Sequence, residues 1–181
     1  ERLQKQTRKK YRRLNKTEYP KIKRTIDRLK NKKLKVSFLT MIETGLRVSE
    51  LSQIKIEDCH ICNEEIRFSF IGKGGKKAFS IINKTDNVPL YNCLKNTILY
   101  YRDKGQFNKK LFYSSQYLQQ KAKLYGFSCL DLRRISAKLE YKKSKSKNQV
   151  RNKLRHAKIK TTDIYLNSPV KMKDKIRGDL E

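Results

Sequence analysis

The segment Leu-Arg-His-Ala-Lys-Ile-Lys-Thr-Thr-Asp-Ile-Tyr at residues 154–165 is the most informative part of this chain, because it places His156 and Tyr165 close together in sequence. Upstream lie Arg133, in Leu-Arg-Arg, and Arg47, in Thr-Gly-Leu-Arg-Val-Ser-Glu-Leu. Arginine binds two phosphate oxygens at once, histidine donates a hydrogen bond, and a tyrosine hydroxyl can attack phosphorus. Each residue alone is ordinarily a surface, structural or core residue, but the four together predict binding and attack of a phosphodiester.

The charge of the chain indicates a polyanionic partner. There are 46 Lys and Arg residues against 17 Asp and Glu residues, which gives a formal net charge of +29. Such a surface repels itself and attracts nucleic acid or, as a second candidate, an anionic membrane. A lysine-rich genome is the alternative source of part of this charge. With 181 residues, of which 36% are hydrophobic, the chain fits one domain with a modest core.

Several classes of protein are excluded by the sequence. It contains no run of 18 apolar residues that would span a membrane and no signal-peptide pattern. Four cysteines fit a reduced, intracellular protein. Cys59 and Cys62, with His60 between them, are not expected to bind a metal, because a structural zinc site needs four ligands and Cys93 and Cys129 stand apart.

Hydrophobic periodicity predicts an α+β domain, mainly helical with a small antiparallel sheet near its middle. Two strands, 66–71 and 78–82, flank the glycine- and lysine-rich turn 72–77, and a third strand is expected to end at 87–90. The expected helices are 17–29, 34–44, a short helix from 49, 91–104, 114–125, 130–143, 146–155 and 161–166.

Two of the predicted joints present basic side chains. Gly45 is suited to end a helix in a left-handed conformation, so Arg47 is expected to project from a tight joint between two helices. In the turn, Lys73, Lys76 and Lys77 compete for the role of delivering a proton. The turn joins two strands and lacks a Gly-Lys-Ser/Thr ending, which argues against a nucleotide-binding P-loop.

Five boxes, in order over residues 17–168, resemble the tyrosine recombinases, or phage integrases, whose catalytic fold is shared with type IB topoisomerases. The box around Arg47 resembles the one that carries the family's first arginine. The turn around Lys73 resembles the one with its lysine, and Leu-Arg-Arg-Ile-Ser-Ala at 132–137 resembles the second-arginine box. Leu-Arg-His at 154–156 and Thr-Thr-Asp-Ile-Tyr at 161–165 resemble the histidine and nucleophile boxes.

The resemblance implies a role for each matching residue. Arg47 and Arg133 would hold the non-bridging oxygens of the scissile phosphate, and His156 would donate a further hydrogen bond. Tyr165 would attack phosphorus and form a 3′-phosphotyrosyl link, while Lys73 would protonate the departing 5′ oxygen. The chemistry would need no metal, ATP or other cofactor. The alternates for the lysine and for the second arginine are Lys76, Lys77 and Arg134.

Two positions depart from the family pattern. Leu130 occupies the place of a histidine or lysine three residues before the second arginine, which is expected to slow proton transfer from the tyrosine. Arg155 replaces the glycine that precedes the family's histidine. We expect Arg155 and Lys160 to contact DNA phosphates, with an altered local turn as the alternative effect of Arg155.

The resemblance also implies a domain organisation. Residues 1–15 would be a basic arm or linker from a missing N-terminal core-binding domain, since the chain begins at Glu1 without a methionine. Residues 16–168 would form the catalytic domain. Residues 169–181 would be a tail that docks on a neighbouring subunit or folds back on its own domain.

The expected function is site-specific recombination of the integrase or transposase type. The partners would be double-stranded DNA and further copies of the chain, as a tetramer on DNA and a monomer off it, with no membrane or small-molecule substrate. The protein would act in the cytoplasm of a prokaryote, at the nucleoid, and be encoded by a phage or mobile element. The alternatives are a catalytically impaired DNA-binding protein of the same fold and a type IB topoisomerase.

Overall fold

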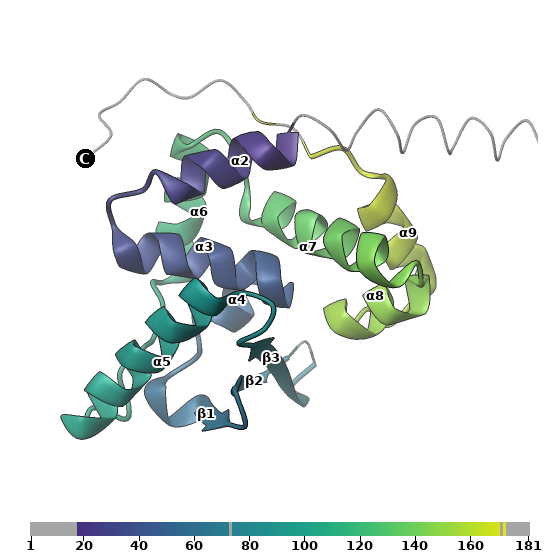
Figure 1. The fold of residues 1–181 in the computed structure, drawn as a ribbon. Helices are drawn as coiled ribbons and strands as arrows, with labels where there is room; N and C mark the ends of the chain where they lie inside the picture. Colours follow the sequence, from purple (N-terminus) through teal and green to yellow (C-terminus); the bar gives the residue numbers. More distant parts are fainter. Residues whose placement is uncertain (1–17, 73, 171, 173–181) are drawn as a thin grey trace, which may run out of the picture.

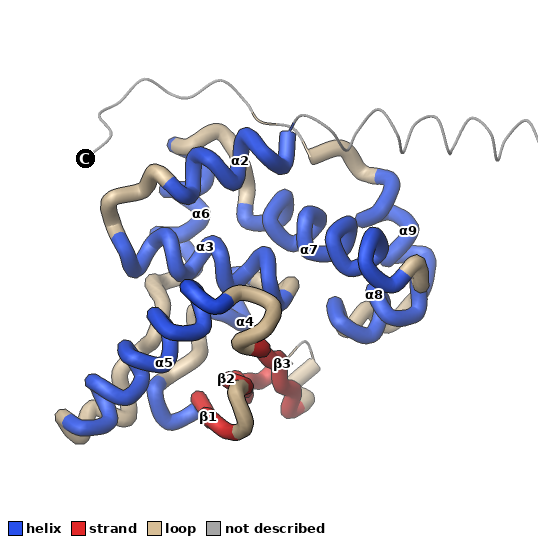
Figure 2. The backbone as a smooth tube through the Cα atoms, in the orientation of Figure 1, coloured by secondary structure: helices blue, strands red, loops and turns tan. Residues whose placement is uncertain are grey.

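Helices make up most of the described chain, and the strands are confined to one corner (Figures 1 and 2). The computed structural model describes residues 18–72, 74–170 and 172. Its helices are α2 (Glu18–Asp27), α3 (Lys32–Thr44), α4 (Val48–Leu51), α5 (Val88–Asp103), α6 (Ser115–Leu124), α7 (Cys129–Ser144), α8 (Lys147–Leu154) and α9 (Ile159–Asn167). A 3₁₀ turn, η1 (Ile56–Asp58), precedes strands β1 (Cys59–Cys62), β2 (Glu65–Ile71) and β3 (Lys77–Asn83).

Helix α3 is central to the main hydrophobic core. Its first turn is capped by Asn31, whose side chain accepts a hydrogen bond from the Leu34 N–H at 2.9 Å. Gly45 ends it in a left-handed conformation with φ of 67°, and the Gly45 N–H donates to the Met41 carbonyl. Phe38 is fully buried and meets Phe127 edge to face, with 5.3 Å between ring centroids. The position of the residues that follow Gly45 is therefore fixed by the packing of α3 in the core.

The strands form an antiparallel sheet in the order β1-β2-β3. Ile66 and Phe68 of β2 are fully buried, and Phe68 packs edge to face on Phe112. The turn between β2 and β3 requires positive φ at Gly74 and Gly75. This turn therefore projects from a sheet whose inner face is anchored in the main core.

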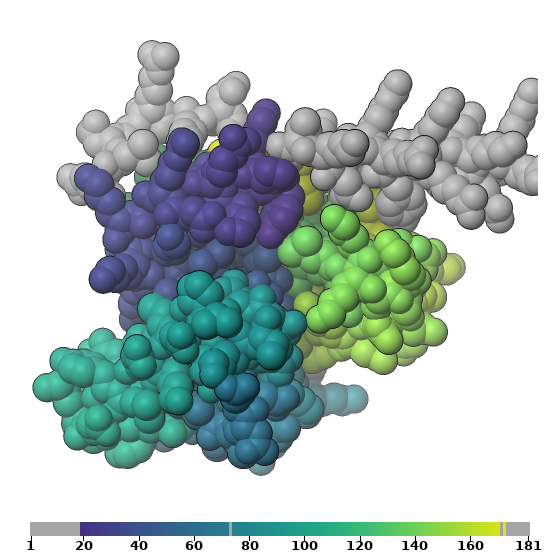
Figure 3. Space-filling model, in the orientation of Figure 1, coloured from purple at the N-terminus to yellow at the C-terminus, as the bar shows by residue number. Residues whose placement is uncertain are grey.

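Helices α8 and α9 pack on the C-terminal half of α7 around a second, smaller cluster. Its buried members are Ala137, Val150, Leu154 and Leu166, with Tyr165 packed against it. Helix α7 enters from the main core, where Leu132 and Ile135 are buried. In the space-filling view the α7–α8 segment forms one side of the molecule, beside α2 and α3 (Figure 3). Helix α7 thus joins the two parts of the hydrophobic interior.

The predicted class, mainly α with a small antiparallel sheet, is confirmed, but the third strand was placed wrongly. It is β1, which precedes the predicted pair. The stretch 87–90 instead opens α5, where Asn87 caps the Leu90 N–H and Pro89 fits the first turn. No described helix is both long and apolar enough to cross a membrane.

The predicted arm and most of the predicted tail lie outside the described residues. At the start of the tail, Val170 is buried in the main core and Met172 packs against it. The beginning of the tail therefore folds onto its own domain, and the docking expected of its remainder stays a prediction.

We expect Gly45→Ala to destabilise the domain by at least about 2 kcal/mol. A Cβ atom at Gly45 would lie 2.4 Å from Leu154 Cδ2 and 3.0 Å from Ser136 Oγ, and the residue would keep a left-handed φ of 67°. The measurement is urea-induced unfolding.

Gly105→Ala is the matched control for this prediction. Gly105 has a similar φ of 66°, but an added Cβ there meets nothing within 4 Å. Gly105→Ala should lower the free energy of unfolding only by the cost of the left-handed conformation. The additional loss in Gly45→Ala then measures the packing clash. Equal losses at the two glycines would contradict the close approach of α3 and α8.

Candidate phosphodiester-cleaving site

A cleft of about 900 Å³ contains the four residues singled out from the sequence or lies directly against them. Arg47, Arg133 and Tyr165 line it, together with residues of α6 and of the loop that leads into α7. His156 is not among the lining residues, but its ring contacts that of Tyr165 edge to face, with 4.6 Å between the two ring centroids. Residues that are far apart in sequence are thus assembled in one place.

Arg133 is buried on α7, with only 2% of its surface exposed. Its two terminal nitrogens donate to the carbonyls of Gly45 and Leu154, the latter at 2.6 Å. Burial and the charge of Arg47 lower the pKa of Arg133 to about 10, which leaves the guanidinium protonated at neutral pH. The nearby Tyr165 side chain acts against these two effects and by itself raises the pKa of Arg133. The Nε atom of Arg133 is buried and has no hydrogen-bond partner among the described residues.

His156 follows α8 and is 5% exposed. Its Nδ1 atom lies 3.0 Å from Thr162 Oγ1, and its Nε2 atom has no partner in the described part of the chain. Burial, followed by the charges of Arg133, Arg47 and Arg155, lowers the pKa of His156 to about 4, so the ring is neutral at pH 7. If the Thr162 hydroxyl donates to Nδ1, Nε2 carries the proton and is a hydrogen-bond donor.

Arg47 is the N-cap residue of α4 and is held by Glu50, three residues later. The Glu50 carboxylate accepts from the Arg47 backbone N–H at 2.8 Å and from Arg47 Nη1 at 2.7 Å. Burial alone would raise the pKa of Glu50, but the Arg47 N–H and the charges of Arg155 and Arg47 bring it below its ordinary value. One-third of the Arg47 side chain stays exposed, so its outer surface can still receive an anion.

Tyr165 lies near the end of α9, and its ring meets the His156 ring edge to face. The guanidinium carbon of Arg133 lies 5.8 Å from the Tyr165 ring centroid. Leu166, the next residue, is buried in the second cluster and fixes the rotation of this helix. Tyr165 thereby lines the cleft.

The lysine prediction remains untested. Lys73 lies outside the described residues, whereas Lys76 and Lys77 are exposed at the end of the turn. Arg134, the alternate for Arg133, forms an ion pair with Asp131 at 3.2 Å and also lines the cleft. Among the two arginines, Arg133 is the one that contacts Gly45 and Leu154.

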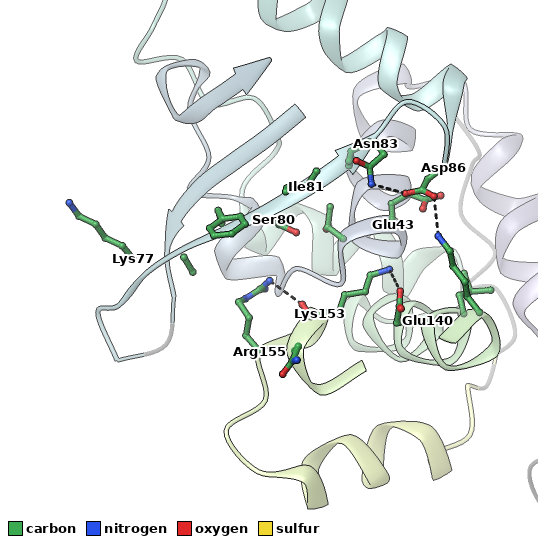
Figure 4. A pocket seen from close by; sticks show the side chains of 16 residues that line it. Glu43, Lys77, Ser80, Ile81, Asn83, Asp86, Glu140, Lys153 and Arg155 are labelled. Atoms are coloured by element: carbon green, nitrogen blue, oxygen red, sulfur yellow. Dashed lines mark hydrogen bonds and ion pairs between the residues drawn. The ribbon is translucent and has the colours of Figure 1, made fainter. Parts of the chain in front are cut away.

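The two departures from the expected pattern occupy different surroundings. Leu130 is 43% exposed and lines the cleft, so an apolar side chain faces the space where a proton acceptor was expected. Arg155 pairs with Glu50 at 2.9 Å. It lines a second cavity of about 670 Å³, between β3 and the helices α7 and α8 (Figure 4). Lys160 is exposed in the first turn of α9.

Sequence reasoning missed Glu50 and Thr162, which hold two of the predicted residues in place. Glu50 could have been found from its position three residues after Arg47, at the start of a helix, which is the spacing of a carboxylate that accepts from a helix-capping N–H. No group of three or more His, Cys, Asp or Glu residues capable of holding a metal occurs among the described residues. Cys59 faces the core and Cys62 is exposed.

Comparison with solved structures identifies the fold. XerH site-specific recombinase, in a pre-cleavage complex with its difH substrate, is similar with a TM-score of 0.64 and 24% identity, over 84% of this chain and 49% of XerH. XerA recombinase is similar with a TM-score of 0.66 and 18% identity, over 81% of this chain and 58% of XerA. Lambda integrase, in a dimer bound to a COC′ core site, is similar with a TM-score of 0.57 and 20% identity, over 90% of this chain and 61% of the integrase chain. The chain thus spans about half the length of the first of these proteins.

The comparison of sequences gives the family. A search among curated proteins finds no match. The model of the phage integrase family, however, matches residues 12–172, which is most of the chain and includes Arg47, Arg133, His156 and Tyr165. On the strength of this match and of the shared fold, the chain belongs to the phage integrase family, the tyrosine recombinases.

Proposed function

We propose that this protein is a site-specific DNA recombinase that cleaves and rejoins double-stranded DNA through a 3′-phosphotyrosyl intermediate. The observation that carries the proposal is the grouping of Tyr165 with Arg133, Arg47 and His156 around one cleft. Arg47 is one-third exposed at the cleft, and the Nε atom of Arg133 and the Nε2 atom of His156 have no hydrogen-bond partner among the described residues, which leaves donors for a phosphate. A net charge of +29 supplies long-range attraction for DNA.

The proposed step is an in-line displacement at phosphorus. The bond from the Tyr165 oxygen to phosphorus forms as the bond from phosphorus to the 5′ oxygen breaks. Arg47, Arg133 and the Nε2–H of His156 stabilise the charge that builds on the non-bridging oxygens. Lys73 protonates the leaving 5′ oxygen, with Lys76 and Lys77 as alternates.

The proton of the tyrosine hydroxyl passes to water in the open cleft, because Leu130 cannot accept it. The number of phosphodiester bonds is conserved in this exchange, so the reaction needs neither ATP nor another energy source. Rejoining is the reverse step, in which a free 5′ hydroxyl attacks the phosphotyrosine.

The proposed partners are double-stranded DNA and further copies of the chain. Exchange between two duplexes requires two cleaving subunits on each, and hence a tetramer on DNA formed from subunits that are monomeric in free solution. Residues 16–168 act as the catalytic domain, and Lys160 is exposed where it can contact a phosphate. A protein encoded by a phage or mobile element, acting at the nucleoid, fits this function.

We expect the wild-type protein to form a covalent adduct with a suicide duplex. The duplex carries the sequence that the protein selects from a random library, with a nick next to the scissile phosphate so that the cleaved end diffuses away. The adduct is measured as a protein–DNA band that resists boiling in detergent.

The exposed Leu130 in the cleft favours a second candidate, a DNA-binding protein of the same fold that cleaves poorly. A chain that binds its selected duplex but gives no adduct supports this candidate and contradicts the recombinase. Relaxation of plasmids that lack the selected site would instead favour a type IB topoisomerase.

A further inference from the structure

Arg155 carries a large side chain at a position whose backbone favours glycine. It follows the last turn of α8 with φ of 54° and ψ of 44°, in the left-handed region. Its own N–H closes the helix by donating to the carbonyls of Arg151 and Asn152. A glycine would make the same backbone bonds without conformational cost, so the contacts of the side chain need an explanation of their own.

The side chain joins three parts of the domain. Arg155 Nη2 donates to Glu50 Oε2 at 2.9 Å, and the guanidinium carbon lies 4.9 Å from the ring centroid of Phe70 in β2. Arg155 Nη1 donates to the carbonyl of Lys153 at 3.2 Å. Figure 4 shows Arg155 extending from the end of α8 toward the sheet. The end of α8, the start of α4 and strand β2 therefore meet at one guanidinium.

Glu50 is the link between Arg155 and the cleft. Its carboxylate is 4% exposed and receives Arg155 on Oε2, while Arg47 reaches both oxygens. A buried carboxylate with a single cation would bind that cation closely. With two cations on Glu50, part of the positive charge of Arg47 stays available for an anion.

Arg155 does not line the cleft that Arg47 and Tyr165 line. Arg47, Arg133 and Tyr165 line the cleft, whereas Arg155 lines the separate cavity between β3 and the helices α7 and α8. Only 23% of its side chain is exposed, and one face is covered by Phe70. Leu154, its neighbour, provides the carbonyl that Arg133 binds. Residues 154–156 are thus connected to both arginines of the cleft. The Leu154 carbonyl accepts from Arg133, and Arg155 binds Glu50, which in turn binds Arg47. The third residue of this segment is His156.

We propose that Arg155 is a positioning residue that holds Glu50 and thereby fixes Arg47 for the scissile phosphate, and that it does not itself bind a DNA phosphate. The inference rests on the proposed function of the cleft. It replaces the phosphate contact expected from the sequence with a role inside the domain.

The first test measures DNA binding and cleavage by Arg155→Gly and Arg155→Lys with the nicked suicide duplex. Arg155→Gly introduces no backbone strain, because glycine adopts the left-handed conformation freely. This variant should form the adduct on the order of 100-fold more slowly at saturating DNA. Its affinity and the salt dependence of that affinity should not change. Arg155→Lys keeps a charge for Glu50 and should recover part of the rate.

The opposite pattern would overturn the proposal. If Arg155 binds a phosphate, Arg155→Gly lowers the slope of log affinity against log salt by about 0.9. The rate at saturating DNA then stays near that of the wild type.

A double-mutant cycle tests whether Arg155 acts through Glu50. In a Glu50→Gln background the carboxylate is gone, so adding Arg155→Gly should slow cleavage little further. A full additional loss in that background would contradict the link between the two residues.

A measurement without DNA separates this inference from the proposed function. The motion of the Arg47 Nε–H bond is followed by ¹⁵N relaxation in the free protein, and it should increase in Arg155→Gly. An Arg47 side chain as restrained in the variant as in the wild type would overturn the positioning role. If the wild type forms no adduct with DNA, the proposed function fails, while the relaxation measurement still decides what Arg155 does to Arg47.

Discussion

Tyr165→Phe is expected to abolish the covalent adduct while DNA affinity stays within about twofold of the wild type. The substitution removes one oxygen atom, and no other described tyrosine lies against both His156 and Arg133. Without that oxygen no bond to phosphorus can form, whereas the ring that packs on the second cluster is retained. The measurement is adduct formation on the suicide duplex, alongside affinity determined by fluorescence anisotropy.

Tyr141→Phe is the matched control, because Tyr141 packs against the same cluster from α7. It should leave the adduct yield unchanged. An adduct that survives Tyr165→Phe would identify another residue as the nucleophile, and loss of the adduct in both variants would point to damaged packing.

Arg133→Ala and Arg47→Ala should both slow cleavage by about 100- to 1,000-fold, the usual cost of removing a donor to a charged transition state. Their effects on stability should differ. Arg133 is buried and its loss leaves the carbonyls of Gly45 and Leu154 without that donor, at a cost of about 1–3 kcal/mol each. Arg47 is one-third exposed, and Glu50 keeps Arg155 as a partner when Arg47 is removed.

Cleavage rates and thermal unfolding of the two variants check this contrast. We expect a clearly lower melting temperature for Arg133→Ala and a small change for Arg47→Ala. Rates near that of the wild type in either variant would remove that arginine from the proposed chemistry. Similar melting temperatures would mean that the two carbonyls find other donors.

Local patterns in the sequence were sufficient to predict most of the elements. Helical spacing of apolar residues located α3 and α7, and the glycine-rich turn located the hairpin of β2 and β3. The misplaced strand has a physical reason. Asn-Val-Pro-Leu resembles the end of a strand, but an asparagine that caps the chain and a proline in the first turn also begin a helix. Strand β1 is short and mixes cysteine and histidine with one isoleucine, so it lacks a clear alternation.

The site could be predicted only in part, because its supporting contacts join distant segments. Arg47, Arg133, His156 and Tyr165 were recognisable from residue type and order. Glu50 and Arg155 are 105 residues apart, and no local pattern indicates that they pair. The direction of a side chain is likewise set by packing, which is why Arg155 could be expected at a phosphate and yet lie against Phe70.

The division of the interior into two clusters has a consequence for control of the reaction. Tyr165 packs against the small cluster with Leu154 and Leu166, whereas Leu46 and Leu51, on either side of Arg47, are buried in the main core. Under the proposed function, a reactive geometry requires that α8 and α9 stay packed on α7. A change that loosens this packing, even far from the cleft, would move Tyr165 away from Arg47 while the main core stays folded. Cleavage would then be thermodynamically coupled to the packing of α8 and α9.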